Sequence, residues 1–209
     1  LLILAKSNAR ATVHRQAYLD YIGVKRFNRQ GEVIGEHRFL GLFTYTAYNA
    51  SLTDIPLLRR KVNRVMERAG FLPNSHGAKA LAVLLEQYPR DELFQIDEEQ
   101  LYTTAMGILR LGERQKTRLF VRRDPYGRFF SCLIFVPRDR YNTELREQMQ
   151  DVLMTAFAGI SAEFSVQLSE SMLARVLMII HTPQGSAPEY DVRGLEQRVA
   201  ETPRLWEDK

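Results

Sequence analysis

The amino-acid sequence predicts an α+β protein made of a strand-rich module, a helical segment and a second module with the order β-α-β-β-α. Three changes of pattern along the chain support this prediction. Residues 1–46 are rich in β-branched and aromatic residues, which favour strands. Residues 54–109 place apolar residues at helical spacing. Residues 118–182 run as strands, switch to helical spacing and then return to strand alternation.

The composition is that of an ordinary globular chain. Of the 209 residues, 45% are hydrophobic and 26% are charged, which allows one or two domains with a sizeable core. The single cysteine, Cys132, cannot form an internal disulfide, and this favours a reducing compartment such as the cytoplasm. No apolar run approaches the roughly 20 residues that cross a bilayer. The chain begins without methionine in a strand-like run and stops in a helix-like one, so we expect it to be part of a longer polypeptide.

The first module is predicted to contain a β-hairpin. A polar segment, residues 28–31, ends in glycine and separates two runs of strand-forming residues. The first run contains Tyr18, Tyr21, Ile22, Val24 and Phe27, and the second contains Val33, Ile34, Phe39, Leu40, Leu42 and Phe43. A polar turn with such flanks predicts two antiparallel strands.

Three helices are predicted between the two strand-rich parts. The first runs from Asp54 to Gly70, the second follows Ser75 until Pro89, and the third follows Asp97. Aspartate and serine are favoured at the start of a helix, because their side chains accept hydrogen bonds from free backbone amides. Glycine commonly ends a helix, and proline interrupts one.

The charged segment 112–116 is the expected boundary between the modules, because strand periodicity begins abruptly after it. We therefore assign residues 1–112 to a strand hairpin and three-helix module, and residues 117–187 to the β-α-β-β module. Residues 188–209 are predicted to be the start of a further helix that the end of the chain cuts off.

The second module opens with a strand, residues 118–123. Residues 124–127 (DPYG) then match the preferences of a type I β-turn. The following run, 129–136, is apolar on both faces, as expected of a central strand that is covered on both sides.

A helix capped by Asn142 or Thr143 follows, and Gly159 is predicted to close it. Residues 162–169 then alternate between apolar and polar, which predicts a strand with one face buried and the other exposed to water or paired with another subunit. Residues 176–180 are almost wholly apolar and predict a buried strand.

No catalytic constellation is recognisable. The chain contains no GxGxxG or GxxxxGK loop for a nucleotide phosphate, and its serines lack the context of a nucleophile elbow. The four histidines, none of which has a partner at metal-ligand spacing, are His14, His37, His76 and His181. We therefore predict no catalytic, cofactor-binding or metal-binding residues in this chain.

One loop is a candidate site for a small ligand. It contains Arg138, Asp139, Arg140, Tyr141 and Asn142, and it leads into a predicted helix. The start of a helix presents free backbone amides and a positive dipole end, which suit a carboxylate. The alternative interpretation is that Asp139 and Asn142 only cap the helix and turn the chain.

A basic run within the first predicted helix has two interpretations. Its residues are Arg59, Arg60, Lys61, Arg64 and Arg68. They suit the solvated face of an amphipathic helix, and they also suit a patch that binds phosphate. We favour the solvated face, because 29 basic and 25 acidic residues give the chain a net charge of only +4. We therefore expect neither a nucleic acid nor a membrane as partner.

Six strings of residues carry a resemblance to a known family. They are VHR (13–15), YLDYIGVK (18–25), RFLGLFT (38–44), DIPLLRRKV (54–62), YPRDELFQI (88–96) and FVPRDRYNT (135–143). With these strings the chain resembles the large bacterial NAD-specific glutamate dehydrogenases. The resemblance covers most of the chain and implies a place in the amino-terminal, non-catalytic half of a very long subunit, where ACT-like and PAS-like modules precede the dehydrogenase domain.

The resemblance also implies a fold for each module. An ACT domain is a ferredoxin-like β-α-β-β-α-β unit, so residues 117–187 are expected to be ACT-like, and the first module is expected to be PAS-like. This sequence departs from the ACT pattern because the last strand is missing and an extra strand, 118–123, comes first. The sequence leaves open whether the extra strand takes the missing strand's place.

The function that the resemblance implies is regulation or oligomerisation of a glutamate dehydrogenase. The parent reaction converts L-glutamate, NAD and water to 2-oxoglutarate, ammonia and NADH, and NAD is expected to bind elsewhere in the subunit. The alternative is an amino-acid sensor, because ACT domains often bind amino acids near the loop after their first strand. Here that loop is 137–142, which contains no glycine. The expected partners are other domains of the same chain, further copies of it and an amino-acid effector.

Overall fold

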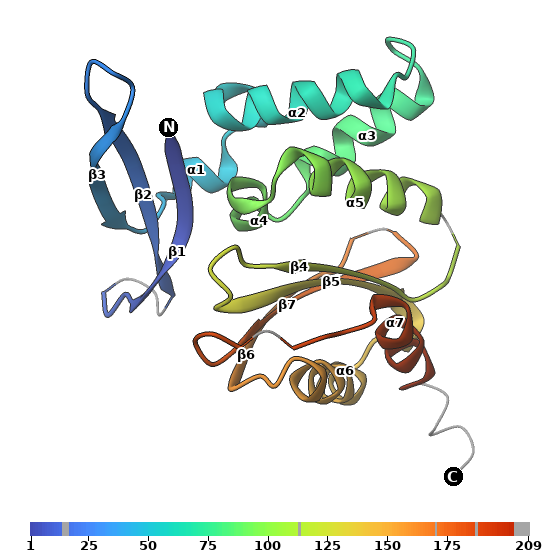
Figure 1. The fold of residues 1–209 in the computed structure, drawn as a ribbon. Helices are drawn as coiled ribbons and strands as arrows, with labels where there is room; N and C mark the ends of the chain where they lie inside the picture. The colour runs from blue at the N-terminus through green and yellow to red at the C-terminus, as the bar shows by residue number, and fades with distance from the viewer. Residues whose placement is uncertain (14–16, 113, 170, 187, 203–209) are drawn as a thin grey trace. The chain divides into compact units, whose positions relative to one another are not determined.

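The computed structural model describes residues 1–13, 17–112, 114–169, 171–186 and 188–202 (Figure 1). Two compact units divide the chain, Leu1–Met106 and Gly107–Lys209. Each unit contains one antiparallel sheet together with helices, which confirms the predicted α+β class. His14, one of the four histidines without a partner at metal-ligand spacing, lies outside the described residues.

The first unit begins with a three-stranded antiparallel sheet in the order β1-β2-β3. Its strands are β1 (Leu2–Arg10), β2 (Tyr18–Phe27) and β3 (Val33–Gly41). The predicted hairpin of β2 and β3 is confirmed. The Asn28 side chain stabilises its turn, because Oδ1 accepts hydrogen bonds from the Gln30 and Glu32 amides at 3.0 and 2.8 Å.

This sheet lacks an apolar core of its own. In β1, β2 and β3 the only buried residues are Asp20 and Gly23. The large apolar side chains of β3 are more than half exposed, and they are Val33, Ile34, Phe39 and Leu40. A sheet normally obtains its stability from a buried apolar face. The position of this sheet must therefore depend on the contacts it makes with other elements.

The helical part of the first unit contains two short helices that the sequence pattern did not predict. In chain order the elements are α1 (Tyr45–Asn49), the 3₁₀ turn η1 (Leu52–Asp54), α2 (Pro56–Ala69), α3 (His76–Glu86), α4 (Arg90–Gln95) and α5 (Glu98–Leu111). The predicted cap of α2 at Asp54 is wrong, because Asp54 ends η1, α2 begins after Ile55 and no side chain caps it. The predicted caps of α3 and α5 are confirmed. Ser75 accepts from the Ala78 amide at 3.2 Å, and Asp97 accepts from the Gln100 amide at 2.7 Å.

The interpretation of Pro89 as a stop was incomplete. Helix α3 does end before Pro89, but the same proline then starts α4 at the residue that precedes its first turn. Proline suits such a position, because a helix start has no use for the missing amide hydrogen. Helix α5 starts in the first unit, and its residues from Gly107 onward belong to the second.

The second unit has a four-stranded antiparallel sheet in the order β4-β5-β7-β6. Its elements are β4 (Arg118–Arg123), β5 (Phe129–Pro137), the 3₁₀ turn η2 (Arg138–Arg140), α6 (Thr143–Ala156), β6 (Ser161–Gln167), β7 (Leu173–His181) and α7 (Val192–Glu201). Strand β7 lies between β5 and β6, which is the split β-α-β arrangement of a ferredoxin-like fold. The predicted β-α-β-β-α order is confirmed.

The extra strand β4 lies at the edge of the sheet, beside β5. In a complete β-α-β-β-α-β unit that edge is occupied by the final strand. Strand β4 therefore takes the position of the strand that the sequence lacks, which the sequence alone left open. The carboxylate of Glu196 from α7 accepts a hydrogen bond from the Leu119 amide of β4 at 2.9 Å. This contact gives one backbone donor at the β4 edge a partner.

Helices α6 and α7 cover one face of this sheet (Figure 1). The buried cluster between them comprises Leu119 of β4, Phe130, Cys132, Ile134 and Val136 of β5, Ala174, Val176, Met178 and Ile180 of β7, Leu145, Met149, Leu153 and Phe157 of the α6 region, and Leu195 and Val199 of α7. All nine residues of β5 are buried, as predicted for a central strand.

Two local predictions for this unit were wrong. Phe164 and Leu168, which the alternating pattern placed on the buried face, are 49% and 55% exposed. The reason is that β6 is an edge strand, where Phe164 packs under the guanidinium of Arg146 at 4.2 Å and reaches no core, and that Leu168 lies beyond the end of β6. The left-handed residue after α6 is Ala158, with φ +50°, and not the predicted Gly159. A Cβ at Gly159 would lie 2.6 Å from Ile180 Cγ2, so glycine is needed there for packing.

Candidate functional site

The predicted ligand loop lies where β5 ends and α6 begins. Arg138 to Arg140 form the turn η2, and Asn142 caps α6 by accepting a hydrogen bond from the Leu145 amide at 2.8 Å. The Arg138 guanidinium donates to the Ser169 carbonyl at 2.7 Å, which ties the loop to the connection between β6 and β7. Of the five predicted residues, Arg138 and Asn142 thus have structural contacts.

The remaining three residues of this loop differ in exposure. Tyr141 packs against the buried cluster of the second unit. Burial raises the pKa of its hydroxyl above the ordinary value, and the positive charge of nearby Arg146 offsets part of this rise. Asp139 and Arg140 are exposed to solvent. The loop therefore offers one exposed carboxylate and one exposed guanidinium beside the start of a helix, a combination that suits a zwitterion of amino-acid size.

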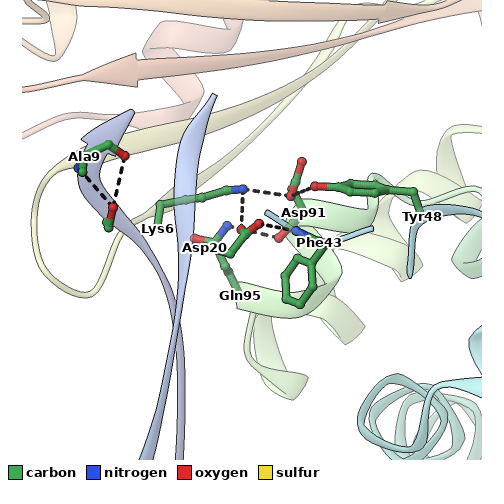
Figure 2. A network of polar contacts seen from close by, with 8 residues as sticks. Lys6, Ala9, Asp20, Phe43, Tyr48, Asp91 and Gln95 are labelled. Carbon is green, nitrogen blue, oxygen red and sulfur yellow. Dashed lines mark hydrogen bonds and ion pairs between the residues drawn. The ribbon is translucent and has the colours of Figure 1, made fainter. Parts of the chain in front are cut away.

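A second polar cluster, which the sequence did not single out, joins the first sheet to the helices of its own unit (Figure 2). Lys6 Nζ of β1 donates to Asp20 Oδ1 of β2 at 2.6 Å and to Asp91 Oδ1 of α4 at 3.0 Å. The Tyr48 hydroxyl donates to the same Asp91 oxygen at 2.8 Å. Asp20 Oδ2 accepts from the Phe43 amide at 3.1 Å. We refer to Lys6, Asp20, Asp91 and Tyr48 as the Lys6 cluster.

The Lys6 cluster is electrostatically suited to hold structure and unsuited to proton transfer. Burial alone would lower the pKa of Lys6. The charges and hydrogen bonds of Asp91 and Asp20 together raise this pKa by more than burial lowers it, so it lies above its ordinary value. A lysine in that state keeps its proton at neutral pH and cannot serve as a general base. The cluster therefore works as an ion pair with two carboxylates around one ammonium.

The sequence carried only a weak signal for this cluster. Asp20 is a lone acidic residue in a strand of aromatic and β-branched residues, and such a residue suits several roles. Its partner Lys6 is 14 residues away, and Asp91 is a further 71 residues beyond Asp20. Only the folded chain brings the three side chains together.

The basic run of α2 is largely engaged within the protein. Lys61 Nζ donates to the Leu93 and Ile96 carbonyls, both at 2.6 Å, and so satisfies acceptors at the end of α4. Arg64 pairs with Glu98 at 2.8 Å, and Arg68 pairs with Glu99. These contacts fix α2 against α4 and α5, and they leave fewer of its cations available to bind phosphate.

Over 1–13, 17–112, 114–169, 171–186 and 188–202 there is no group of three His, Cys, Asp or Glu side chains that could hold a metal ion. Across these same ranges, no helix is both long and apolar enough to cross a membrane.

Comparison with known proteins gives two matched regions within this chain. Residues 55–114 match the model described as "Glutamate dehydrogenase, helical motif 1", and residues 118–207 match "Glutamate dehydrogenase, ACT2 domain". The first region spans α2 to α5, and the second spans the four-stranded sheet with α6 and α7.

Curated relatives match along the entire chain. It is 48% identical over 208 residues to the NAD-specific glutamate dehydrogenase of Halomonas elongata and 46% identical over 208 residues to that of Pseudomonas aeruginosa. It is 34% identical over 221 residues to that of Mycobacterium tuberculosis. Each match covers 100% of this chain and 13% of the relative, so the chain spans about an eighth of the length of these enzymes.

Proposed function

Because this chain belongs to the large NAD-specific glutamate dehydrogenases, we propose that it is a non-catalytic regulatory and oligomerisation segment of such an enzyme. The parent enzyme acts in the cytoplasm and converts L-glutamate, NAD and water to 2-oxoglutarate, ammonia and NADH. The NAD site and the reacting groups belong to other parts of the subunit. The partners of this segment are those other parts and further copies of the chain.

One observation carries this proposal. The regions matched as a helical motif and an ACT2 domain fill most of the chain. Lys6 joins a sheet to a helix, and Lys61 and Arg64 fix α2 against its neighbours. Such side chains support the position of secondary-structure elements, which is the requirement of an assembly segment.

The proposal is tested in the full-length parent enzyme with the substitution Lys6→Met. We expect kcat, measured per assembled subunit by NADH absorbance, to stay within about twofold, because Lys6 touches no reacting group. We also expect the distribution of oligomers, measured by light scattering, to shift toward smaller species. The matched control is Lys79→Met, which replaces an exposed lysine of α3. A large loss of kcat in fully assembled Lys6→Met enzyme would contradict the proposal.

The second candidate function is an amino-acid sensor at the loop that contains Arg138, Asp139, Arg140, Tyr141 and Asn142. The exposed pair of Asp139 and Arg140 beside the start of α6 favours it. Calorimetric titration with each of the twenty amino acids should give heat with one of them, and Arg140→Ala should abolish this heat. Arg193→Ala, which removes an exposed arginine of α7 outside this loop, serves as the control. Twenty silent titrations would remove this candidate.

A further inference from the structure

The outer edge of β3 is a free strand edge. Among the residues that the structure describes, β3 pairs only with β2, and no strand or helix lies hydrogen-bonded along its other side. The strand is nine residues long and nearly all of it is exposed. Proteins usually blunt such an edge with proline, a very short strand, charged side chains or a β-bulge, because it can pair with another chain. Strand β3 contains no proline, its charged residues are complementary between two antiparallel copies, and its irregularity lies at Ile34, near one end.

The sequence of β3 is complementary to itself when it is read in the opposite direction. From Val33 to Gly41 it reads VIGEHRFLG, with His37 at the centre. In an antiparallel pair of two copies centred on His37, Glu36 of each copy lies opposite Arg38 of the other. Ile34 lies opposite Leu40, and Gly35 lies opposite Phe39. The pairs on either side of the central His37 are thus charge-complementary, apolar or aromatic on glycine.

We propose that two copies of this chain pair along β3, antiparallel and about a two-fold axis at His37, to form a continuous six-stranded sheet. An interface of this kind uses the same surface of both subunits, so every contact occurs twice. The proposal rests on the oligomerisation role proposed above and names the surface that carries it.

The charged residues at the centre of β3 are placed to bridge the two copies. Glu36 Oε1 accepts from the Tyr21 hydroxyl at 2.5 Å and from Arg38 Nε at 2.6 Å in its own sheet. The Arg38 side chain is 67% exposed, whereas that of Glu36 is 20% exposed. The guanidinium therefore has donors directed to solvent that can reach the Glu36 carboxylate of the opposing copy. Opposite charges that face each other across two strands are stabilising, and like charges are destabilising.

The apolar residues of β3 gain cover from the same arrangement. Phe39 is 58% exposed, and opposite it lies Gly35, whose missing side chain leaves room for an aromatic ring. Leu40, which is 58% exposed, lies on the other face of the sheet and points toward the end of the opposing copy that carries Ile34, where β3 pairs irregularly with β2. The pairing thus gives partners to apolar side chains in a sheet that has no apolar core of its own.

A symmetric cross-link tests the axis of this pairing. Across the proposed axis, residue 37 of one copy lies opposite residue 37 of the other. The Cα atoms of such opposing residues are about 4.5 to 5.5 Å apart, which suits a disulfide in the His37→Cys variant. We expect His37→Cys to form covalent dimers with oxidised glutathione, as two thiols lose their protons and electrons to the oxidant. Arg29→Cys, at the hairpin tip and far from the axis, is the matched control and should form no covalent dimer. The native Cys132 is buried.

Charge reversal tests the pairing of side chains. Sedimentation velocity of the full 209-residue chain should show a dimer that Glu36→Lys or Arg38→Glu alone weakens about tenfold, because each places two pairs of like charges across the axis. The double variant E36K/R38E restores complementarity and should restore the dimer. Circular dichroism establishes that each variant is folded.

The outcomes separate the two proposals. A monomeric chain, equal cross-linking of His37→Cys and Arg29→Cys, or a dimer that is insensitive to charge reversal would each overturn pairing along β3. In the last case oligomerisation through another surface would still stand. Binding of NAD by this chain would instead overturn the proposed function and leave the β3 result unaffected.

Discussion

Lys6 links the first sheet to helix α4. Its side chain is 18% exposed and contacts Asp20, which is 8% exposed, and Asp91, which is 40% exposed. Removal of a cation from two partly buried carboxylates leaves them without compensation. We expect Lys6→Met to lower the free energy of opening of β1 and β2 by about 2 kcal/mol, less than for a fully buried pair, because Asp91 reaches solvent.

Hydrogen–deuterium exchange of the β2 amides measures this change, with Lys79→Met as control. The pH dependence gives a second readout. Because the folded pKa of Lys6 lies above its ordinary value of 10.5, its stabilisation is complete below that pH and is lost only as pH rises through the folded pKa. The difference in the free energy of opening between the native chain and Lys6→Met should therefore be the same at pH 7 and at pH 9. A difference that vanishes by pH 9 would assign the effect to another group.

Ala158 carries backbone strain that glycine would relieve. Its φ of +50° is in the left-handed region, where a Cβ costs about 1 kcal/mol. Ala158 is exposed, so its methyl group contributes little packing. Ala158→Gly should stabilise the second unit by about 1 kcal/mol in thermal unfolding. Ala156→Gly, two residues earlier and still helical, should destabilise it by a similar amount. Equal effects of the two substitutions would show that φ is not the cause.

Individual residues were predicted from the sequence only where their partners are local. The caps at Ser75, Asp97 and Asn142 involve amides three residues away, so the sequence alone indicated them. The contact of Lys6 with Asp91 joins residues 85 positions apart, and no local sequence pattern predicts it. The ligand loop was likewise proposed from a helix start, but the sequence could not show that Arg138 reaches the Ser169 carbonyl.

At the scale of elements, Glu196 joins α7 to the edge of β4. Its carboxylate accepts from the Leu119 amide and from the Arg118 guanidinium, both at 2.9 Å. Glu196→Ala leaves the amide of a buried residue without this partner, which costs about 1–3 kcal/mol. We expect a corresponding loss of stability of the second unit in urea, and faster exchange of the Leu119 amide. Glu201→Ala, an exposed position on the same helix, should have little effect.

Elements with strong periodicity were predicted correctly, and those shaped by tertiary contacts were not. The long helices α2, α3, α5 and α6 follow from apolar spacing. Helix α4 has only six residues and follows directly on Pro89, so its pattern was too short to recognise. The exposure of Phe164 depends on β6 being an edge strand, and strand order is set by contacts that are distant in sequence.

At the scale of the whole molecule, the two units differ in how they are stabilised. The four-stranded sheet has a continuous apolar cluster under α6 and α7. The three-stranded sheet has none, and its most buried side chain is the carboxylate of Asp20. A difference of this kind suits a chain in which one unit is a stable fold and part of the other completes itself through contacts with partners.

The central claim is that this segment serves a glutamate dehydrogenase without taking part in its chemistry. The most direct test is a calorimetric titration of the chain with NAD, in the presence and absence of L-glutamate, followed by an assay for NADH at 340 nm. We predict no heat of NAD binding and no NADH. Saturable binding of NAD, or glutamate-dependent formation of NADH, would contradict the claim.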